Sequence, residues 1–146
     1  MTVKIKSTII ERFSDGDVIM TEGVMSSKAY IIHKGKVRIS KKIGNKAITV
    51  VALTEGDIFG EMGLFQQTVR FASAIAVGDV EVGIIDKNRF DELMNQTPAD
   101  MKELINALID RLRITTEKAT VVGVKWEKAR KVLDEVAHVL SRENIN

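Results

Sequence analysis

Cysteine is absent from this sequence of 146 residues, and histidine occurs only at His33 and His138. Without cysteine, the protein has no disulfide, no thiolate metal site and no cysteine nucleophile. The two histidines fall in different halves of the chain, and they form neither a metal-ligand set of the usual composition, such as that of a cupin, nor a nucleophile–base arrangement. We therefore expect a protein that is not an enzyme and that holds no metal or other cofactor.

An excess of charge of one sign and long hydrophobic runs are also absent. The 22 basic and 20 acidic residues give a net charge of +2, which is too balanced to predict a large nucleic-acid footprint. Residues 1–13 lack the continuous apolar core of a signal peptide, and no later stretch reaches the ~18 apolar residues of a membrane span. The expectations are a cytoplasmic location and no direct contact with membrane or nucleic acid.

The composition present, 45% hydrophobic and 29% charged, is typical of one compact domain. Up to about residue 86, short apolar runs alternate with glycine-containing turn signals such as Lys34-Gly35 and Gly78-Asp79, which predicts β structure. The predicted fold class is α+β, an antiparallel, jelly-roll-like β-roll over residues 1–97 followed by C-terminal helices over 98–146. The predicted strands are 3–10, 17–21, 29–33, 36–41, 47–53, 73–77 and 81–85.

After Asp86 the apolar spacing becomes helical. Asp86 is a candidate cap for a short helix, and Thr97 with Pro98 predicts the start of a longer one. We expect that helix to break at Gly123 and a last packing or lever helix to occupy residues 126–141.

A largely apolar seam with three- and four-residue steps runs along the longer helix. The seam packs either onto the β half of its own chain or against a second copy, which would make a homodimer through helix 98–122. Its residues are Met101, Leu104, Ile105, Leu108, Leu112, Thr115, Ala119 and Val122.

The segment 56–76 concentrates residues suited to binding an anion. Gly60 and Gly63 allow close backbone approach, and a helical turn starting there aims free N–H groups outward. Arg70 offers forked donors to a phosphate, and the Ser73 hydroxyl adds another. Glu61 needs a donor partner, such as a sugar hydroxyl or an arginine. On spacing alone, Glu61 is equally a helix-end charge and Arg70 a solvated strand-end residue.

The sequence GEMGLF at 60–65, followed by RFAS at 70–73, resembles the phosphate-binding cassette of cyclic nucleotide-binding domains. The resemblance extends over most of the chain, from FSDGDVI at 13–19 to Pro98. It implies that Glu61 binds the ribose 2′-hydroxyl and that Arg70 neutralises the cyclic phosphate. The backbone of Ala72 and the hydroxyl of Ser73 would complete a cradle that also includes Gly60, Met62 and Gly63.

Two residues depart from the family pattern. Val69 stands where proline often precedes the arginine, and Phe71 stands where alanine, serine or threonine is usual. The missing hydroxyl at Phe71 makes cGMP a less favoured ligand than cAMP, while the bulk of the ring could crowd the pocket. A dimeric scaffold that has lost its ligand is therefore an alternative function.

The helix sequence RLRITTEK at 111–118 resembles the dimerising helix of bacterial catabolite activators of the Crp/Fnr type. In that helix, paired hydroxyl residues contact adenine, one from each subunit. The resemblance implies this role for Thr115 and Thr116. The alternative is that both threonines face solvent. Ile39 and Val50 are candidate walls of the base pocket.

The resulting interpretation is a regulatory module that binds a cyclic nucleotide, most simply cAMP, and relays binding through its C-terminal helices to an unknown effector. Transcription factors of this branch continue into a helix-turn-helix domain, for which no room remains after residue 141. A sensor fragment of a longer transcription regulator is a further alternative.

Overall fold

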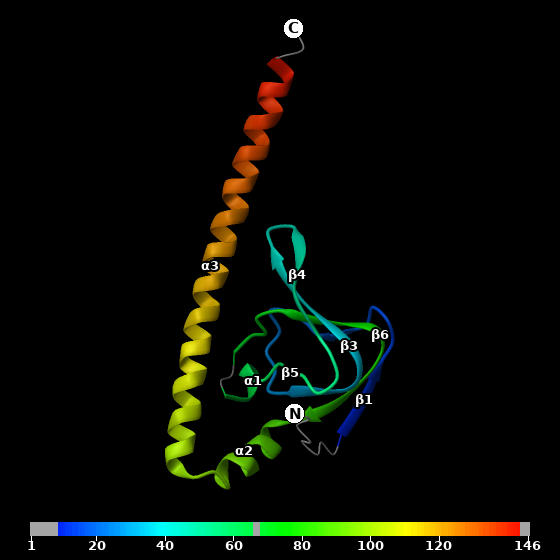
Figure 1. Ribbon diagram of the computed structural model, residues 1–146, viewed down its shortest axis with the longest axis vertical. Coiled ribbons are helices and arrows are strands. Elements are labelled where there is room, and N and C mark those ends of the chain that lie inside the picture. Colours follow the sequence, from blue (N-terminus) through cyan, green and yellow to red (C-terminus); the bar gives the residue numbers. More distant parts are fainter. Residues whose placement is uncertain (1–8, 66–67, 144–146) are drawn as a thin grey trace.

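The computed structural model describes residues 9–65 and 68–143. An antiparallel sheet forms the β half, and a 45-residue helix runs beside and beyond it (Figure 1). In chain order the elements are β1 Ile9–Phe13, β2 Val18–Met20, β3 Ala29–Ile43, β4 Lys46–Leu53, β5 Ile58–Phe59, α1 Met62–Phe65, β6 Ser73–Ile85, α2 Lys87–Asn95 and α3 Ala99–Glu143.

All the strand pairs in the described residues are antiparallel, and the sheet follows the order β1-β6-β3-β4. The short strands β2 and β5 pair with β6 and β3. The sheet does not close on itself along this path. The predicted class, an antiparallel β fold followed by C-terminal helices, is confirmed.

The two longest strands each join two predicted strands into one. Strand β3 spans predicted strands 29–33 and 36–41, and β6 spans 73–77 and 81–85. The turns predicted at Gly35 and Gly78 are therefore wrong. Both glycines have a positive φ, and the β3–β6 register shifts on either side of Lys34, so the glycine at 35 bends the strand without reversing it.

Smaller differences concern the first strands. Strand β1 continues to Phe13, whereas residues 3–8 of the predicted first strand lie outside the described residues. Strand β5 was not predicted, because two residues are too short to show a period. The remaining predicted strands match β2 and β4 within one residue at each end.

The main core is formed by aliphatic and aromatic side chains of the sheet. Ile32, Val37 and Val82 are less than 2% exposed, and the rings of Tyr30 and Phe59 stack with centroids 5.0 Å apart. Burial of such side chains is the main stabilising contribution to the β half.

A second, smaller cluster holds the two short helices to the sheet. Leu64 of α1 packs with Ile85 at the end of β6. Phe65 and Phe90 meet edge to face with centroids 4.6 Å apart, which links α1 to α2.

The helical part confirms one predicted cap and contradicts another. The Asp86 carboxylate accepts the Arg89 N–H at 2.8 Å, as expected of an N-cap. Helix α3 begins at Ala99, two residues after Thr97, and the Thr97 hydroxyl donates to the Leu93 carbonyl at the end of α2.

The predicted break at Gly123 is also wrong, since α3 is continuous from Ala99 to Glu143. A single glycine costs only about 1 kcal/mol in a helix, which is too little to interrupt a helix of 45 residues even with valines on both sides. None of the helices in the described ranges is long and apolar enough to cross a membrane.

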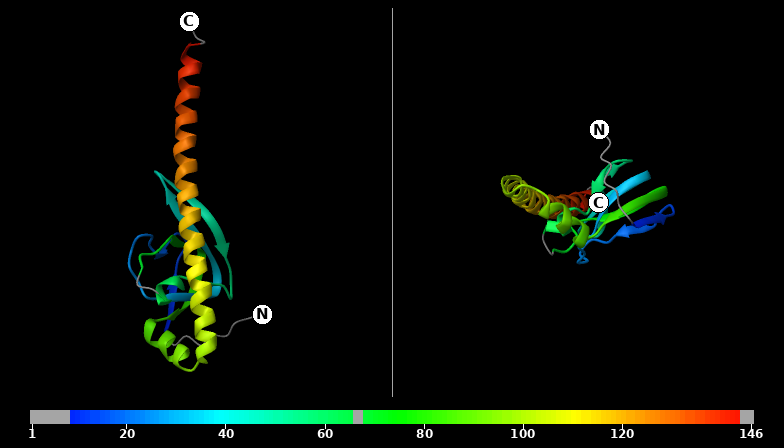
Figure 2. Two further views of the ribbon diagram at one scale, coloured as in Figure 1. Left: turned by 90° about the vertical axis from the view of Figure 1, so that its left-hand side faces the viewer. Right: turned by 90° about the horizontal axis from the view of Figure 1, so that it is seen from below.

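Helix α3 runs along one side of the β half and continues past the β3–β4 hairpin (Figure 2). Most of the predicted seam is not covered by the β half: Leu104, Leu108 and Val122 are 54%, 55% and 66% exposed. Ile105, at the edge of the seam, is partly buried, as are Ile109 and Thr116, which do not belong to the seam. Packing of the whole seam onto its own β half is therefore excluded.

Candidate functional site

The segment between β5 and β6 is folded around one arginine. Arg70 is 5% exposed. Its Nη1 donates to the carbonyl of Gly60 at 2.6 Å, and its Nη2 donates to the Ser26 hydroxyl at 2.9 Å and to the Lys28 carbonyl. Its Nε is buried and has no partner among the described residues. The alternative that Arg70 is a solvated strand-end residue is therefore wrong.

Burial lowers the pKa of Arg70, whereas Tyr30 and the charge of Glu61 act to raise it. Burial also raises the pKa of Tyr30, with Arg70 opposing that shift. A cation held among carbonyl oxygens and beside a carboxylate stabilises the cassette and creates a positive centre beneath it.

The two cassette glycines are needed because the backbone wraps closely around this side chain. Gly60 has φ +73°, and an added Cβ would lie 3.0 Å from Arg70 Nη1. At Gly63 a Cβ would meet the Ser26 carbonyl and lie 2.8 Å from the same Nη1. The sequence predicted close approach of an anion at these glycines; in the structure they make room for the arginine.

The loop before β3 was not predicted to take part, yet it closes the cassette from the other side. The Arg70 N–H donates to the Val24 carbonyl and the Gly23 N–H donates to the Arg70 carbonyl, both at 2.9 Å. Met25 forms a single antiparallel bridge with Val69. The only sequence signal for this loop was the Glu22-Gly23 turn.

The other predicted cassette residues lie around this centre. Glu61 and Met62 are partly exposed, and Ala72 is buried. The Ser73 Oγ accepts the Glu22 N–H at 2.9 Å, which leaves the hydroxyl proton free to be donated elsewhere. Their roles toward a ligand stay predictions.

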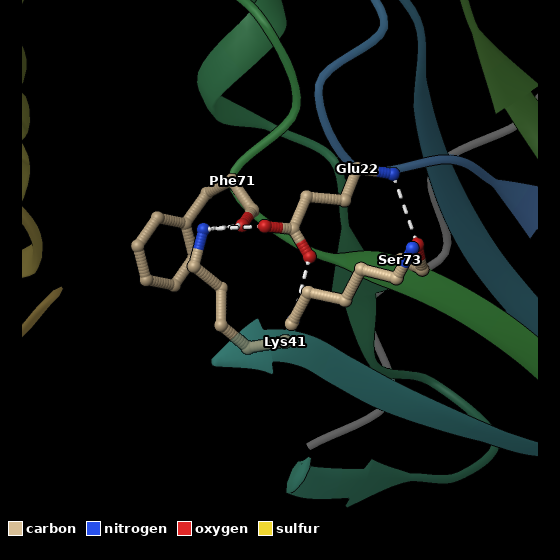
Figure 3. A network of polar contacts seen from close by, with 5 residues as sticks. Glu22, Lys41, Phe71 and Ser73 are labelled. Carbon is tan, nitrogen blue, oxygen red and sulfur yellow. Dashed lines mark hydrogen bonds and ion pairs between the residues drawn. The ribbon is translucent and has the colours of Figure 1, made fainter. Parts of the chain in front are cut away.

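A polar network that the sequence did not predict joins the cassette to the end of β3 (Figure 3). Lys41 Nζ lies 2.8 Å from Glu22 Oε1, donates to the Phe71 carbonyl at 2.7 Å and lies 4.3 Å from the centre of the Phe71 ring. The second carboxylate oxygen of Glu22 accepts the Lys42 N–H at 2.8 Å. The side chains of Lys41 and Glu22 are 16% and 22% exposed, so water screens this pair less than a surface pair.

A pocket of about 360 Å³ opens beside this network, between the β3–β4 hairpin and α3. It brings together four predicted residues, Val50, Phe71, Thr115 and Thr116. Lys41, Lys42, Ile43, Ile48 and Ala119 complete the lining and were not predicted to be in the site.

The pocket leaves out some of the predicted residues. Ile39 packs against the main core and does not line it, which contradicts its expected role as a pocket wall. Gly60, Glu61, Met62, Gly63, Arg70, Ala72 and Ser73 do not line it either. Phe71 alone belongs to both the cassette and the pocket, so it connects an arginine-centred region to an apolar cavity.

Metal binding finds no support in the described part of the chain, where no three histidine, aspartate or glutamate side chains gather in a way that could hold an ion. His33 lies on β3 and His138 on α3, far apart in the fold as in the sequence.

Known proteins with similar sequences have names that refer to cAMP. The cyclic AMP receptor protein of Thermus thermophilus is 31% identical over 102 residues, which cover 69% of this chain and 47% of the receptor. The cAMP-dependent protein kinase regulatory subunit of Candida albicans is 33% identical over 94 residues, or 64% of this chain and 20% of the subunit. The chain thus spans about half the length of the first relative and a fifth of the second.

Solved structures agree with the sequence matches. The cAMP-bound form of the EAL enzyme Bd1971 has a TM-score of 0.69 at 27% identity, covering 92% of this chain and 34% of that one. Its cGMP-bound form has a TM-score of 0.64 at 33% identity, covering 72% and 28%. The family match itself extends over residues 10–97, more than half of the chain. The chain therefore belongs to the cyclic nucleotide-binding domain family.

Proposed function

We propose that this protein is a non-enzymatic, cytoplasmic module that binds cAMP and relays the binding event through α3. The observation that carries the proposal is that the cassette residue Phe71 and the helix residues Thr115 and Thr116 line one pocket. A ligand there touches the β half and α3 at the same time. Its binding energy therefore depends on where α3 lies, which is the condition for a ligand to shift the position of a helix.

The family resemblance supports the proposed roles within the site. Glu61 accepts a hydrogen bond from the ribose, and Arg70 faces the cyclic phosphate with the backbone of Ala72 and the hydroxyl of Ser73. Three of the five guanidinium N–H groups of Arg70 are used by protein oxygens. The remaining donors, including the buried Nε, reach a phosphate once the cassette opens.

The helix supplies the rest of the proposal. Exposed Leu104, Leu108 and Leu112 provide a surface for a homodimer through helix 98–122. The adenine amine then meets Thr115 and Thr116 from the two subunits. The unknown effector is contacted by α3, either as a separate protein or as another part of a longer regulator.

Isothermal titration with cAMP and, separately, cGMP tests this proposal. Arg70→Ala and Glu61→Gln are the site variants, and Arg12→Ala, which removes one exposed arginine charge, is the matched control. Loss of a charge-assisted hydrogen bond is expected to weaken cAMP binding about 10- to 150-fold in each site variant. Binding by Arg12→Ala should not change, because Arg12 pairs with Glu81 away from the pocket.

Thermal unfolding distinguishes the alternatives. At 100 times its dissociation constant, cAMP should raise the stability of the unmodified protein by about 2.7 kcal/mol. No heat with either nucleotide and no change in melting temperature would favour the ligand-free dimeric scaffold. Stronger binding of cGMP than of cAMP would contradict the assignment of the base.

A further inference from the structure

The aromatic ring of Phe71 occupies an unusual position in this pocket. It is 41% exposed although it lies beside the buried Arg70 and Ala72. The other walls of the pocket are aliphatic or polar. They come from the two lysines at 41 and 42, from Ile43, Ile48 and Val50, and from the α3 residues Thr115, Thr116 and Ala119. Phe71 is therefore the single flat π-surface among the described residues that line the pocket.

Lys41 restrains this ring from the β3 side. Its ammonium has three partners at once: the Glu22 carboxylate, the Phe71 carbonyl and the Phe71 ring face (Figure 3). The carboxylate of Glu22 is held in turn by the Lys42 N–H. A cation that contacts both the backbone and the ring of one residue limits how far that ring can rotate. Because Glu22 neutralises it, Lys41 is poorly placed to act as a free charge for a ligand.

The geometry and the apolar lining lead to a specific role for this pair. We infer that Phe71 is a stacking platform for a purine base, and that Lys41 is a positioning residue that fixes the platform before the ligand arrives. This inference rests on the proposed nucleotide-binding function and deepens it by naming a specificity-determining residue. A preorganised aromatic surface favours large, flat bases because stacking gains with overlap area.

The test compares two ligands that share the ribose and the cyclic phosphate and differ only in the base, cAMP and 3′,5′-cyclic UMP. Phe71→Leu removes the π-surface and keeps an apolar side chain. It should weaken cAMP binding about 5- to 150-fold and cyclic UMP binding much less, so the ratio of the two affinities falls. A merely structural loss would lower both affinities together. Phe71→Tyr keeps the ring and should keep the ratio.

Lys41→Met and Lys42→Met form a matched pair of charge removals on neighbouring pocket residues. Lys41→Met should lower the ratio of the cAMP and cyclic UMP affinities, as Phe71→Leu does. Lys42→Met should leave the ratio unchanged, because Lys42 contacts Glu22 through its backbone N–H. Combined with Phe71→Leu, Lys41→Met should cause no further fall in the ratio. A further fall would mean that Lys41 contacts the ligand directly and would overturn its positioning role.

Other outcomes are equally decisive. An unchanged ratio in Phe71→Leu, or tighter cAMP binding because a crowding ring has been removed, would overturn the platform. Both proposals would be supported if Arg70→Ala abolished the binding of cAMP and of cyclic UMP while Phe71→Leu lowered the ratio of the two affinities. Failure of the unmodified protein to bind either nucleotide would overturn the proposed function and this inference with it.

Discussion

The β half and helix α3 bury their apolar residues to very different extents. In the β half Ile32 and Val82 are 1% and 0% exposed, while on α3 Leu133 and Leu140 are 65% and 56% exposed. The β half thus contains its own core, whereas α3 carries apolar side chains that its own chain leaves uncovered. Helices of this kind derive most of their stability from tertiary packing. The pocket between the β3–β4 hairpin and α3 lies where these two differently stabilised regions meet.

The largest expected effect comes from truncating matched side chains in the two regions. Ile32→Ala should lower the free energy of unfolding by about 2–5 kcal/mol, because it leaves a cavity in a closed core. Leu133→Ala, at an exposed position, should change it by no more than about 0.5 kcal/mol. Chemical denaturation followed by circular dichroism measures both.

The same pair of variants also tests whether α3 is covered in solution. If Leu133→Ala costs as much as Ile32→Ala, the distal part of α3 is packed against another chain. In that case the cost should fall on dilution, because the covering surface comes from a second molecule.

An intermediate effect is expected from adding one methyl group at a glycine in each region. Gly35→Ala should destabilise the protein by about 1–3 kcal/mol, since φ is +95° there and the new Cβ collides with the Asp79 carbonyl. Gly123→Ala should stabilise α3 by up to about 1 kcal/mol through helix propensity. The melting temperatures should therefore move in opposite directions. A stabilising Gly35→Ala would contradict the close approach of Gly35 to Asp79.

The smallest effect on the free energy of unfolding is expected at Asp86, where the β half passes into the helices. Asp86→Ala should cost about 1 kcal/mol, because the first turn of α2 loses its cap. Asp91→Ala is the control in the same helix, and its exposed pair with Lys87 should contribute less than about 0.5 kcal/mol. Equal losses for the two variants would show that the Asp86 hydrogen bond does not stabilise this junction.

The features predicted correctly from the sequence depend on neighbouring residues. The antiparallel strands, the Asp86 cap and the short helical turn in the cassette all have local patterns. The lengths of β3 and β6 were mispredicted because the β3–β6 register shifts around Gly35, where the backbone approaches Asp79, a residue of another strand. Whether a glycine turns or only bends a strand is decided by what pairs with it.

In the candidate site, too, contacts between residues far apart in the sequence could not be predicted. The GEMGLF and RFAS segments could be found by resemblance. The network around Lys41 could not, because its partners Glu22 and Phe71 are 19 and 30 residues away in the sequence.

Ile39 was a candidate wall of the base pocket, yet it packs on the main core. The β3–β4 register shifts between Ile39 and Ser40, whose partners are Val51 and Thr49, so Val50 is an extra residue on β4. Such a shift depends on how two strands pair and leaves no local pattern in the sequence.

The unbroken course of α3 through Gly123 determines how far a small movement at the pocket travels. From Thr115 to its end at Glu143 the helix extends about 42 Å at ~1.5 Å per residue. A tilt of about 10° about the pocket would displace that end by roughly 7 Å, more than one helical turn. With a flexible joint at Gly123, the same tilt would be lost after about 12 Å of helix. As a stiff rod, α3 would convert an adjustment the size of a base into a displacement on the scale of a protein contact.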